Sequence, residues 1–115
     1  MSFRVIATPG HSDDGLMLVS DEYKMVFTGD TIYPGALYAH LSQSNLKLYR
    51  DVVAGLADEY ADYTLFCSHN NPMWEGSVLG DIAAAFDEVI AKKDSGESTE
   101  TERFEFEGTD FAIIA

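Results

Sequence analysis

The chain is 115 residues long and 46% hydrophobic, a size that suits one domain with a buried core. Its 20 acidic and 7 basic residues give a formal net charge of -13, which repels nucleic acid phosphates and anionic membranes, so we expect neither as a partner. No apolar run reaches the roughly 20 residues that span a bilayer, and no signal-type apolar core follows a basic start. We therefore expect one soluble, cytoplasmic domain, residues 1–115.

Two interpretations of this acidity stay open. Hydrated acidic side chains keep a protein soluble through mutual repulsion. Alternatively, the charge is an adaptation to high salt, where screening relieves the self-repulsion of the folded chain.

The one cysteine, Cys67, excludes an intramolecular disulfide and an all-cysteine zinc site. Because it ends the apolar run 63–67, we expect it to act as a small buried hydrophobic residue.

The N-terminal part of the chain predicts three strands. Residues 3–7 form an apolar run ended by a Pro-Gly pair, and residues 15–20 and 24–28 predict a hairpin joined by a three-residue turn. Residues 31–44 have no clean period and predict a long irregular loop, of the kind that shapes a substrate pocket.

Two amphipathic helices are predicted in the second half. Apolar residues recur at spacings of three and four over residues 45–60, with Ser44 available as the N-cap. A second apolar stripe covers residues 78–90 and begins after Gly76 and Ser77, either of which is expected to cap it.

The remaining segments predict short strands and a connector. Residues 64–67 form a short buried strand between the helices, and residues 94–102 are a polar, exposed connector. Four apolar residues then alternate around Gly108, which predicts a C-terminal hairpin laid against the sheet: Phe104, Phe106, Phe111 and Ile113.

Three residues with metal-ligand side chains follow predicted strands in loops rich in Gly, Ser or Pro: His11, Asp30 and His69. In an α/β sheet such strand ends meet at one edge, where ligands usually bind. Neutral imidazole and carboxylate suit zinc, iron or manganese, and three protein ligands leave a position where water becomes an acidic, hydrolytic nucleophile. The alternative is structural, since each side chain can also cap a loop or hydrogen-bond backbone amides.

Other polar residues near these loops have two interpretations each. Asp13 and Asp14 are an extra ligand or general base, or solvated turn residues. Tyr33 and Tyr38 donate hydrogen bonds to a substrate oxyanion, or pack in a pocket wall. His40 is a fourth ligand, or an exposed loop histidine.

At residues 8–11 (Thr-Pro-Gly-His), 27–30 (Phe-Thr-Gly-Asp) and 68–69 (Ser-His), the chain resembles the metallo-β-lactamase superfamily, whose later metal motifs share this order and spacing. The resemblance continues through residues 31–39 and both helices to residues 103–108, as in a branch of poorly characterised hydrolases with thioesterase-like members. It implies the C-terminal half of an αββα sandwich. The expected fold class is thus α/β (α+β), a mixed sheet with two main helices on one face.

The resemblance also implies a role for each ligand. His11 would serve a first metal, Asp30 would bridge, and His69 would serve a second, with zinc as the expected ion and iron or manganese as alternatives. The family's first metal motif, His-x-His-x-Asp-His, does not occur here, so one copy cannot build a standard binuclear centre. Three states stay open: a mononuclear site with water, a site completed by a partner chain, or no metal.

Half of a sandwich would leave one sheet face open to water. Such a face favours assembly, so we expect either a homodimer or a partner chain that supplies the N-terminal half. The expected function is metal-assisted hydrolysis of an ester, thioester or amide carbonyl in a small-molecule substrate, with Asp30 and Tyr38 as catalytic residues. Its alternative is a non-catalytic half-domain that dimerises or complements a partner chain.

Overall fold

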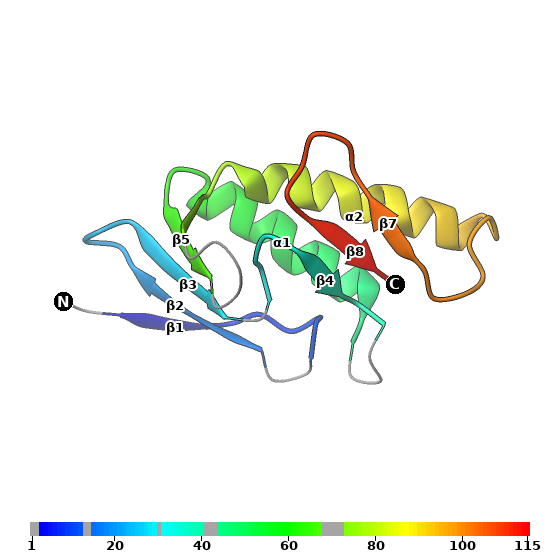
Figure 1. Ribbon diagram of the computed structural model, residues 1–115. Coiled ribbons are helices and arrows are strands. Elements are labelled where there is room, and N and C mark those ends of the chain that lie inside the picture. Colours follow the sequence, from blue (N-terminus) through cyan, green and yellow to red (C-terminus); the bar gives the residue numbers. More distant parts are fainter. Residues whose placement is uncertain (1–2, 13–14, 30, 41–43, 68–72) are drawn as a thin grey trace.

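A computed structural model describes residues 3–12, 15–29, 31–40, 44–67 and 73–115. It contains two helices, α1 (Leu46–Tyr60) and α2 (Val78–Asp94), which run side by side while the strands of a small sheet pass in front of them (Figure 1). The described residues also form eight strands: β1 (Arg4–Ala7), β2 (Leu16–Ser20), β3 (Met25–Gly29), β4 (Ala36–Tyr38), β5 (Thr64–Cys67), β6 (Met73–Glu75), β7 (Arg103–Glu105) and β8 (Ala112–Ile114).

The strands form two sheets, one of five strands in the order β1-β2-β3-β5-β6 and one of three in the order β4-β8-β7. In the larger sheet, β2 pairs antiparallel with both β1 and β3, and β3 pairs parallel with β5. Strands β1, β3 and β5 therefore run in the same direction. Their carboxyl ends lie at one edge of the sheet.

The core lies between the larger sheet and the helices. Side chains that alternate along the strands, such as Met17, Val26 and Leu65, are fully buried in one cluster with residues of both helices. The rings of Tyr49 in α1 and Phe86 in α2 meet there at 4.6 Å between centroids. This arrangement confirms a mixed α/β architecture with two helices on one face of the sheet.

The opposite face of the five-stranded sheet is apolar and faces away from the helices. Val5 is 62% exposed and Leu16 is 59% exposed. We call this surface the open face; its apolar residues are Phe3, Val5, Leu16, Leu18, Phe27, Phe66 and Met73.

The structure differs from the sequence analysis at three places. The loop predicted over residues 31–44 contains β4, which pairs parallel with β8 near the end of the chain. Strand β6 was not expected and pairs antiparallel with β5. The C-terminal hairpin of β7 and β8 is confirmed, but it joins β4 in a separate sheet rather than lying against the larger one. The partner of β4 lies near the other end of the chain, whereas β6 pairs with the strand that precedes it; each has only three residues and no clear local signal.

The helix ends also differ in detail. The N-cap of α1 is Asn45, whose side-chain oxygen accepts a hydrogen bond from the Leu48 backbone nitrogen at 3.0 Å, and not Ser44. Ser77 occupies the N-cap position of α2 as expected, but its side chain makes no capping hydrogen bond. Within the described ranges, neither helix is both long and apolar enough to cross a lipid bilayer.

Candidate metal centre

The site is built from the carboxyl ends of β1, β3 and β5. Gly29 at the end of β3 is in register with Cys67 at the end of β5. Gly29 has a φ of 56°, a conformation that glycine adopts without the steric cost of a side chain. Asp30 follows Gly29 in the sequence and His69 follows Cys67 by two positions, but both lie outside the described residues.

Threonine side chains connect the loops at this edge. The hydroxyls of Thr8, after β1, and Thr31, after β3, lie 3.5 Å apart and both residues are buried. Thr28 donates a hydrogen bond to the backbone oxygen of Ile32 at 2.6 Å and lies 3.3 Å from the backbone oxygen of Phe66. Sequence reasoning missed these contacts, although threonines near the carboxyl ends of two predicted strands, β1 and β3, were a usable signal.

His11 is oriented by the chain around it. Its Nδ1 lies 2.9 Å from the backbone oxygen of Tyr38. Because a carbonyl oxygen only accepts, Nδ1 carries the proton, and the Nε2 of the neutral ring keeps a lone pair that can bind a metal. The Ser44 hydroxyl donates to the His11 backbone oxygen at 2.7 Å, and the ring meets Tyr49 edge-on at 6.5 Å.

Gly10 brings the His11 loop close to α1. A Cβ added to Gly10 would lie 2.4 Å from the Cα of Tyr49, and the φ of Gly10 is 139°. The Asn45 backbone nitrogen donates to the Gly10 backbone oxygen at 2.7 Å. Only glycine fits this close approach, which fixes the loop against the start of the helix.

The two candidate tyrosines are used differently. The Tyr33 hydroxyl donates to the backbone oxygen of Ala36, so it takes part in shaping the loop before β4. The Tyr38 side chain is 41% exposed, and its ring meets that of His40 edge-on at 5.2 Å. Because the exposed phenol belongs to the residue whose backbone oxygen contacts His11, Tyr38, rather than Tyr33, is the candidate to contact a substrate.

A third tyrosine, Tyr49, was not singled out from the sequence as a site residue. It is fully buried, its hydroxyl donates to the backbone oxygen of Thr31, and burial raises the pKa of its phenol. Tyr49 therefore stays neutral and connects α1 to the loop after β3.

Among the residues that the structure describes, no group of three His, Cys, Asp or Glu side chains could hold a metal. Asp30 and His69 are outside this set, as are Asp13 and Asp14. Cys67 was expected to be buried but is half-buried, and burial raises the pKa of its thiol. A protonated thiol is a poor metal ligand at neutral pH.

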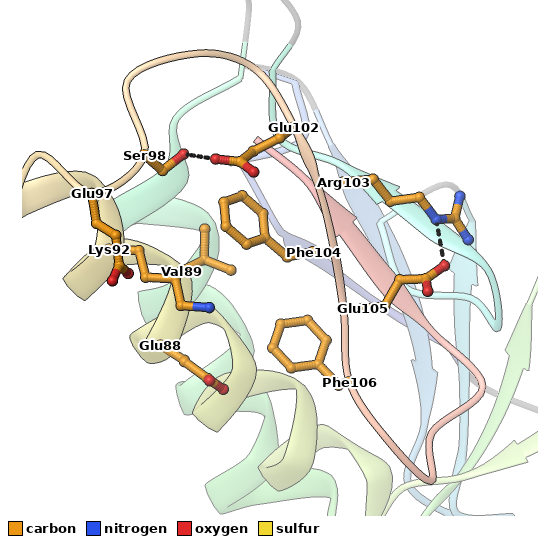
Figure 2. A pocket seen from close by; sticks show the side chains of 10 residues that line it. All are labelled: Glu88, Val89, Lys92, Glu97, Ser98, Glu102, Arg103, Phe104, Glu105 and Phe106. Atoms are coloured by element: carbon orange, nitrogen blue, oxygen red, sulfur yellow. Dashed lines mark hydrogen bonds and ion pairs between the residues drawn. The ribbon is translucent and has the colours of Figure 1, made fainter.

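A polar pocket of about 350 Å³ lies elsewhere, between α2 and β7 (Figure 2). Glu88, Glu97 and Glu105 line it together with Lys92 and Arg103. Its charges are mixed and none of the candidate ligands contributes to it. The pocket is therefore separate from the strand-end site.

Solved structures with a similar fold share too little sequence to show more than the fold. ETHE1 from Myxococcus xanthus has a TM-score of 0.64 and 20% identity over 85% of this chain and 47% of that one. The mono-zinc form of the metallo-β-lactamase FIM-1 from Pseudomonas aeruginosa has a TM-score of 0.60 and 21% identity, over 74% of this chain and 39% of the FIM-1 chain. TTHA1623 in a di-iron-bound form has a TM-score of 0.61 and 22% identity, over 68% of this chain and 39% of the TTHA1623 chain.

Comparisons with protein-family models and with curated proteins give no match. The chain spans less than half the length of each of the three solved structures above. The expected fold, part of a metallo-β-lactamase-like sandwich, is confirmed over the 68% to 85% of this chain that these structures cover.

Proposed function

We propose that this chain, which has the fold of part of a metallo-β-lactamase-like protein, is a metal-dependent hydrolase domain that acts on an ester, thioester or amide carbonyl. The supporting observation is the common direction of β1, β3 and β5. Each of these strands ends shortly before one of the three proposed ligands, His11, Asp30 and His69. In α/β sheets, ligands bind outside the carboxyl ends of the strands.

The chemistry of His11 fits a metal ligand. A ligating histidine usually donates its second ring N–H to a carbonyl or carboxylate, which fixes the ring and raises its basicity. The Nδ1 contact with the Tyr38 carbonyl has this form. Two imidazoles and one carboxylate suit zinc or iron, and two proteins of similar fold are a mono-zinc and a di-iron form.

When bound, the ion would supply Lewis acidity and lower the pKa of water. The residues of the chain have the other roles. His11 and His69 would hold the ion as neutral imidazoles, and the Asp30 carboxylate would also hold it and would accept a hydrogen bond that orients the attacking water. The Tyr38 hydroxyl donates to the carbonyl oxygen of the substrate as negative charge develops on it.

Metal analysis tests the ligand set. The chain has three histidines. His40 provides the matched control, because its ring lies against Tyr38 and it is not one of the three proposed ligands. We expect protein purified without added metal to contain zinc, iron or manganese. His11→Ala and His69→Ala should each weaken zinc binding by more than about 100-fold, since loss of even a supporting group costs about 10- to 100-fold, and His40→Ala should bind as the parent does.

Hydrolysis assays then separate an enzyme from a non-catalytic half-domain. Activity on p-nitrophenyl acetate and on an acyl thioester should depend on added metal and disappear in His11→Ala and His69→Ala. Absence of metal in the purified protein together with no zinc binding by calorimetry would contradict the proposal. Equal metal loss in His40→Ala would contradict the assigned ligands.

A further inference from the structure

One buried side chain of α1, that of Tyr49, contacts two of the loops that carry proposed ligands. Tyr49 is fully buried in the core, where its ring packs against Phe86 at 4.6 Å between centroids. The loop after β1 contains His11, and the loop after β3 contains Asp30. Tyr49 contacts the first loop through its backbone and ring, and the second through its hydroxyl.

The contact with the His11 loop is a close approach of two backbones. A Cβ added to Gly10 would lie 2.4 Å from the Cα of Tyr49 and 2.6 Å from its Cβ, so only glycine fits there. The rings of Tyr49 and His11 also meet edge-on at 6.5 Å between centroids. The backbone nitrogen of Asn45, the N-cap of α1, donates to the Gly10 backbone oxygen at 2.7 Å. The start of α1 therefore holds the chain directly before His11.

The contact with the Asp30 loop is a hydrogen bond. The Tyr49 hydroxyl donates to the backbone oxygen of Thr31, and both residues are buried. Removal of this hydroxyl would leave a buried carbonyl oxygen without its donor, which costs more free energy than loss of an exposed bond. Gly29, on the other side of Asp30, is paired with Cys67. The chain is thus held on both sides of Asp30, which itself lies outside the described residues.

The two loops also touch each other directly. The hydroxyls of Thr8 and Thr31 lie 3.5 Å apart, a separation at which a hydrogen bond between hydroxyls is weak. This contact alone does not fix how far apart the loops lie. Their separation therefore depends on the bridge through Tyr49, whose ring cannot move because it is packed in the core.

We propose that Tyr49 is a positioning residue of the metal centre, which holds the His11 loop and the Asp30 loop at the separation that one ion requires. Ligands must be kept within about 0.5 Å of the binding geometry by residues that packing and hydrogen bonds lock in place. A bridge that is already formed in the metal-free chain also lowers the entropic cost of ordering two loops around an ion. The inference rests on the proposed function, because it takes His11 and Asp30 as ligands.

Tyr49→Phe tests this role, since it keeps the ring and removes only the hydroxyl that bonds to Thr31. Tyr60→Phe is the matched control. It removes the same group from a second buried tyrosine of α1, whose hydroxyl accepts a hydrogen bond from Arg4 at 3.2 Å and contacts neither loop in the described chain. Tyr49→Phe should raise the zinc dissociation constant measured by calorimetry by about tenfold, the lower end of what loss of a supporting group costs. Tyr60→Phe should bind zinc as the parent does.

Hydrogen exchange of the metal-free protein gives a readout that needs no ion. The Thr31 backbone nitrogen donates to the Thr28 backbone oxygen at 3.2 Å, so exchange of the Thr31 amide reports whether this loop is held. In Tyr49→Phe this amide should exchange up to about tenfold faster, as expected for loss of one buried hydrogen bond. The amides of β2 should exchange as in the parent, and Tyr60→Phe should leave the Thr31 amide unchanged.

The two readouts separate failure of this inference from failure of the proposed function. A parent protein that binds no zinc would overturn both. A parent that binds zinc, with an unchanged dissociation constant in Tyr49→Phe or an equal loss in Tyr60→Phe, would overturn this inference alone. So would exchange in Tyr49→Phe that is equally faster at Thr31 and throughout β2, because the weaker binding would then reflect general loss of stability.

Discussion

His11 and Tyr38 are joined by a hydrogen bond of 2.9 Å from the imidazole Nδ1 to the Tyr38 backbone oxygen. Tyr38 ends β4, a strand held by parallel pairing with β8. The C-terminal strand therefore supports the position of a proposed ligand near the start of the chain. Because the acceptor is a backbone atom, the contact does not depend on the Tyr38 side chain.

This separation allows a clean test of the Tyr38 hydroxyl. Tyr38→Phe keeps the carbonyl that orients His11 and removes only the phenol oxygen. We expect unchanged metal content and a fall in kcat of about 10- to 100-fold, toward the low end of what loss of one oxyanion donor costs. Steady-state kinetics and elemental analysis on the same sample measure both quantities. A lower metal content with unchanged kcat per bound ion would contradict this role.

Gly10→Ala should destabilise the fold and the His11 loop together. The new Cβ would lie 2.4 Å from the Cα of Tyr49, at a residue whose φ is 139°. Overpacking and backbone strain should lower the free energy of unfolding by about 2 to 4 kcal/mol.

Gly55→Ala is the control for Gly10→Ala. Gly55 lies within α1, and a Cβ there meets nothing within 4 Å. This variant should be more stable by about 0.5 to 1 kcal/mol, because alanine loses less backbone entropy in a helix. Urea unfolding measures both changes. Equal effects of the two substitutions would rule out the close approach of Gly10 to α1.

Asn45 and Ser44 should have different effects although they are adjacent. Asn45→Ala removes the N-cap bond to the Leu48 backbone nitrogen and should cost about 1 kcal/mol of stability. Ser44→Ala removes a hydrogen bond to the His11 backbone oxygen, so it should affect metal affinity more than stability. Thermal unfolding and zinc titration of each variant distinguish the two roles, and the reverse pattern would make Ser44 the cap.

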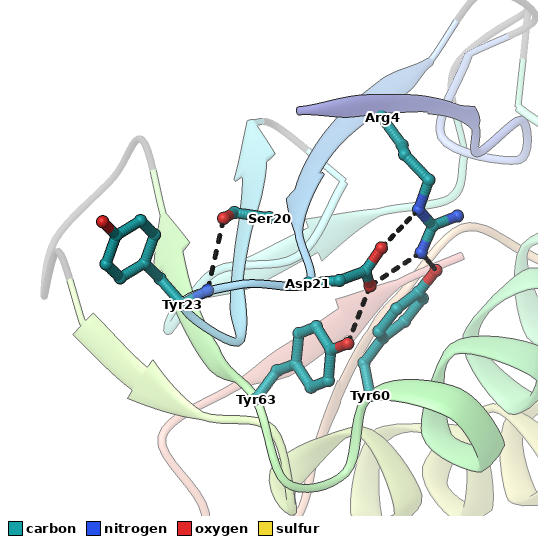
Figure 3. Close-up of polar contacts among 6 residues, drawn as sticks. All are labelled: Arg4, Ser20, Asp21, Tyr23, Tyr60 and Tyr63. Carbon is teal, nitrogen blue, oxygen red and sulfur yellow. Dashed lines mark hydrogen bonds and ion pairs between the residues drawn. The ribbon is translucent and has the colours of Figure 1, made fainter. Parts of the chain in front are cut away.

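The stability of the chain should fall in acid through the Asp21 network shown in Figure 3. Arg4 donates to Asp21 at 2.7 and 3.0 Å, and Tyr63 donates at 2.8 Å. The Arg4 hydrogen bonds, followed by that of Tyr63, lower the pKa of Asp21 from 3.8 to about 2. A lowered pKa contributes stability above pH 3.8 that is lost as the pH falls toward 2.

Urea midpoints between pH 5 and pH 2 measure this contribution. Asp21→Asn and Arg4→Gln should each reduce the slope of stability against pH in the window from 3.8 to 2. The double variant should add little to either, because the two residues share one interaction. An unchanged slope in Asp21→Asn would show that other carboxylates cause the acid sensitivity.

The net charge of -13 predicts a dependence on salt. If the acidity is an adaptation to high salt, the melting temperature should rise between dilute buffer and molar potassium chloride, since screening relieves self-repulsion. Scanning calorimetry at two protein concentrations separates this effect from dimer formation. A melting temperature that does not rise supports the simpler interpretation of a hydrated acidic surface.

The sequence predicted the elements whose signals are local. Burial of one side of each helix, and of one side of β1, β2 and β3, produces a regular spacing of apolar residues that can be seen directly in the sequence. By contrast, β4 and β6 have three residues each and are stabilised by β8 and β5. Three residues are too few to show a strand pattern, and β4 depends in addition on a partner far away in the sequence.

The candidate site was predictable as a set of strand ends, but not in its supporting contacts. His11, Asp30 and His69 were found because ligand side chains follow apolar runs. The carbonyl that orients His11 comes from β4, and the buried Thr8 and Thr31 hydroxyls meet across loops 23 residues apart. Both contacts require the tertiary fold. Asp30 and His69 themselves remain predictions.

A crystal structure of zinc-soaked protein, with anomalous data at the zinc edge, tests the central claim most directly. We expect one anomalous peak at about 2.0 to 2.2 Å from the Nε2 of His11, a carboxylate oxygen of Asp30 and a ring nitrogen of His69. The proposed ligand set would be contradicted by a zinc peak elsewhere, with these three side chains well ordered and more than about 4 Å from it, because that separation exceeds any zinc–ligand bond length.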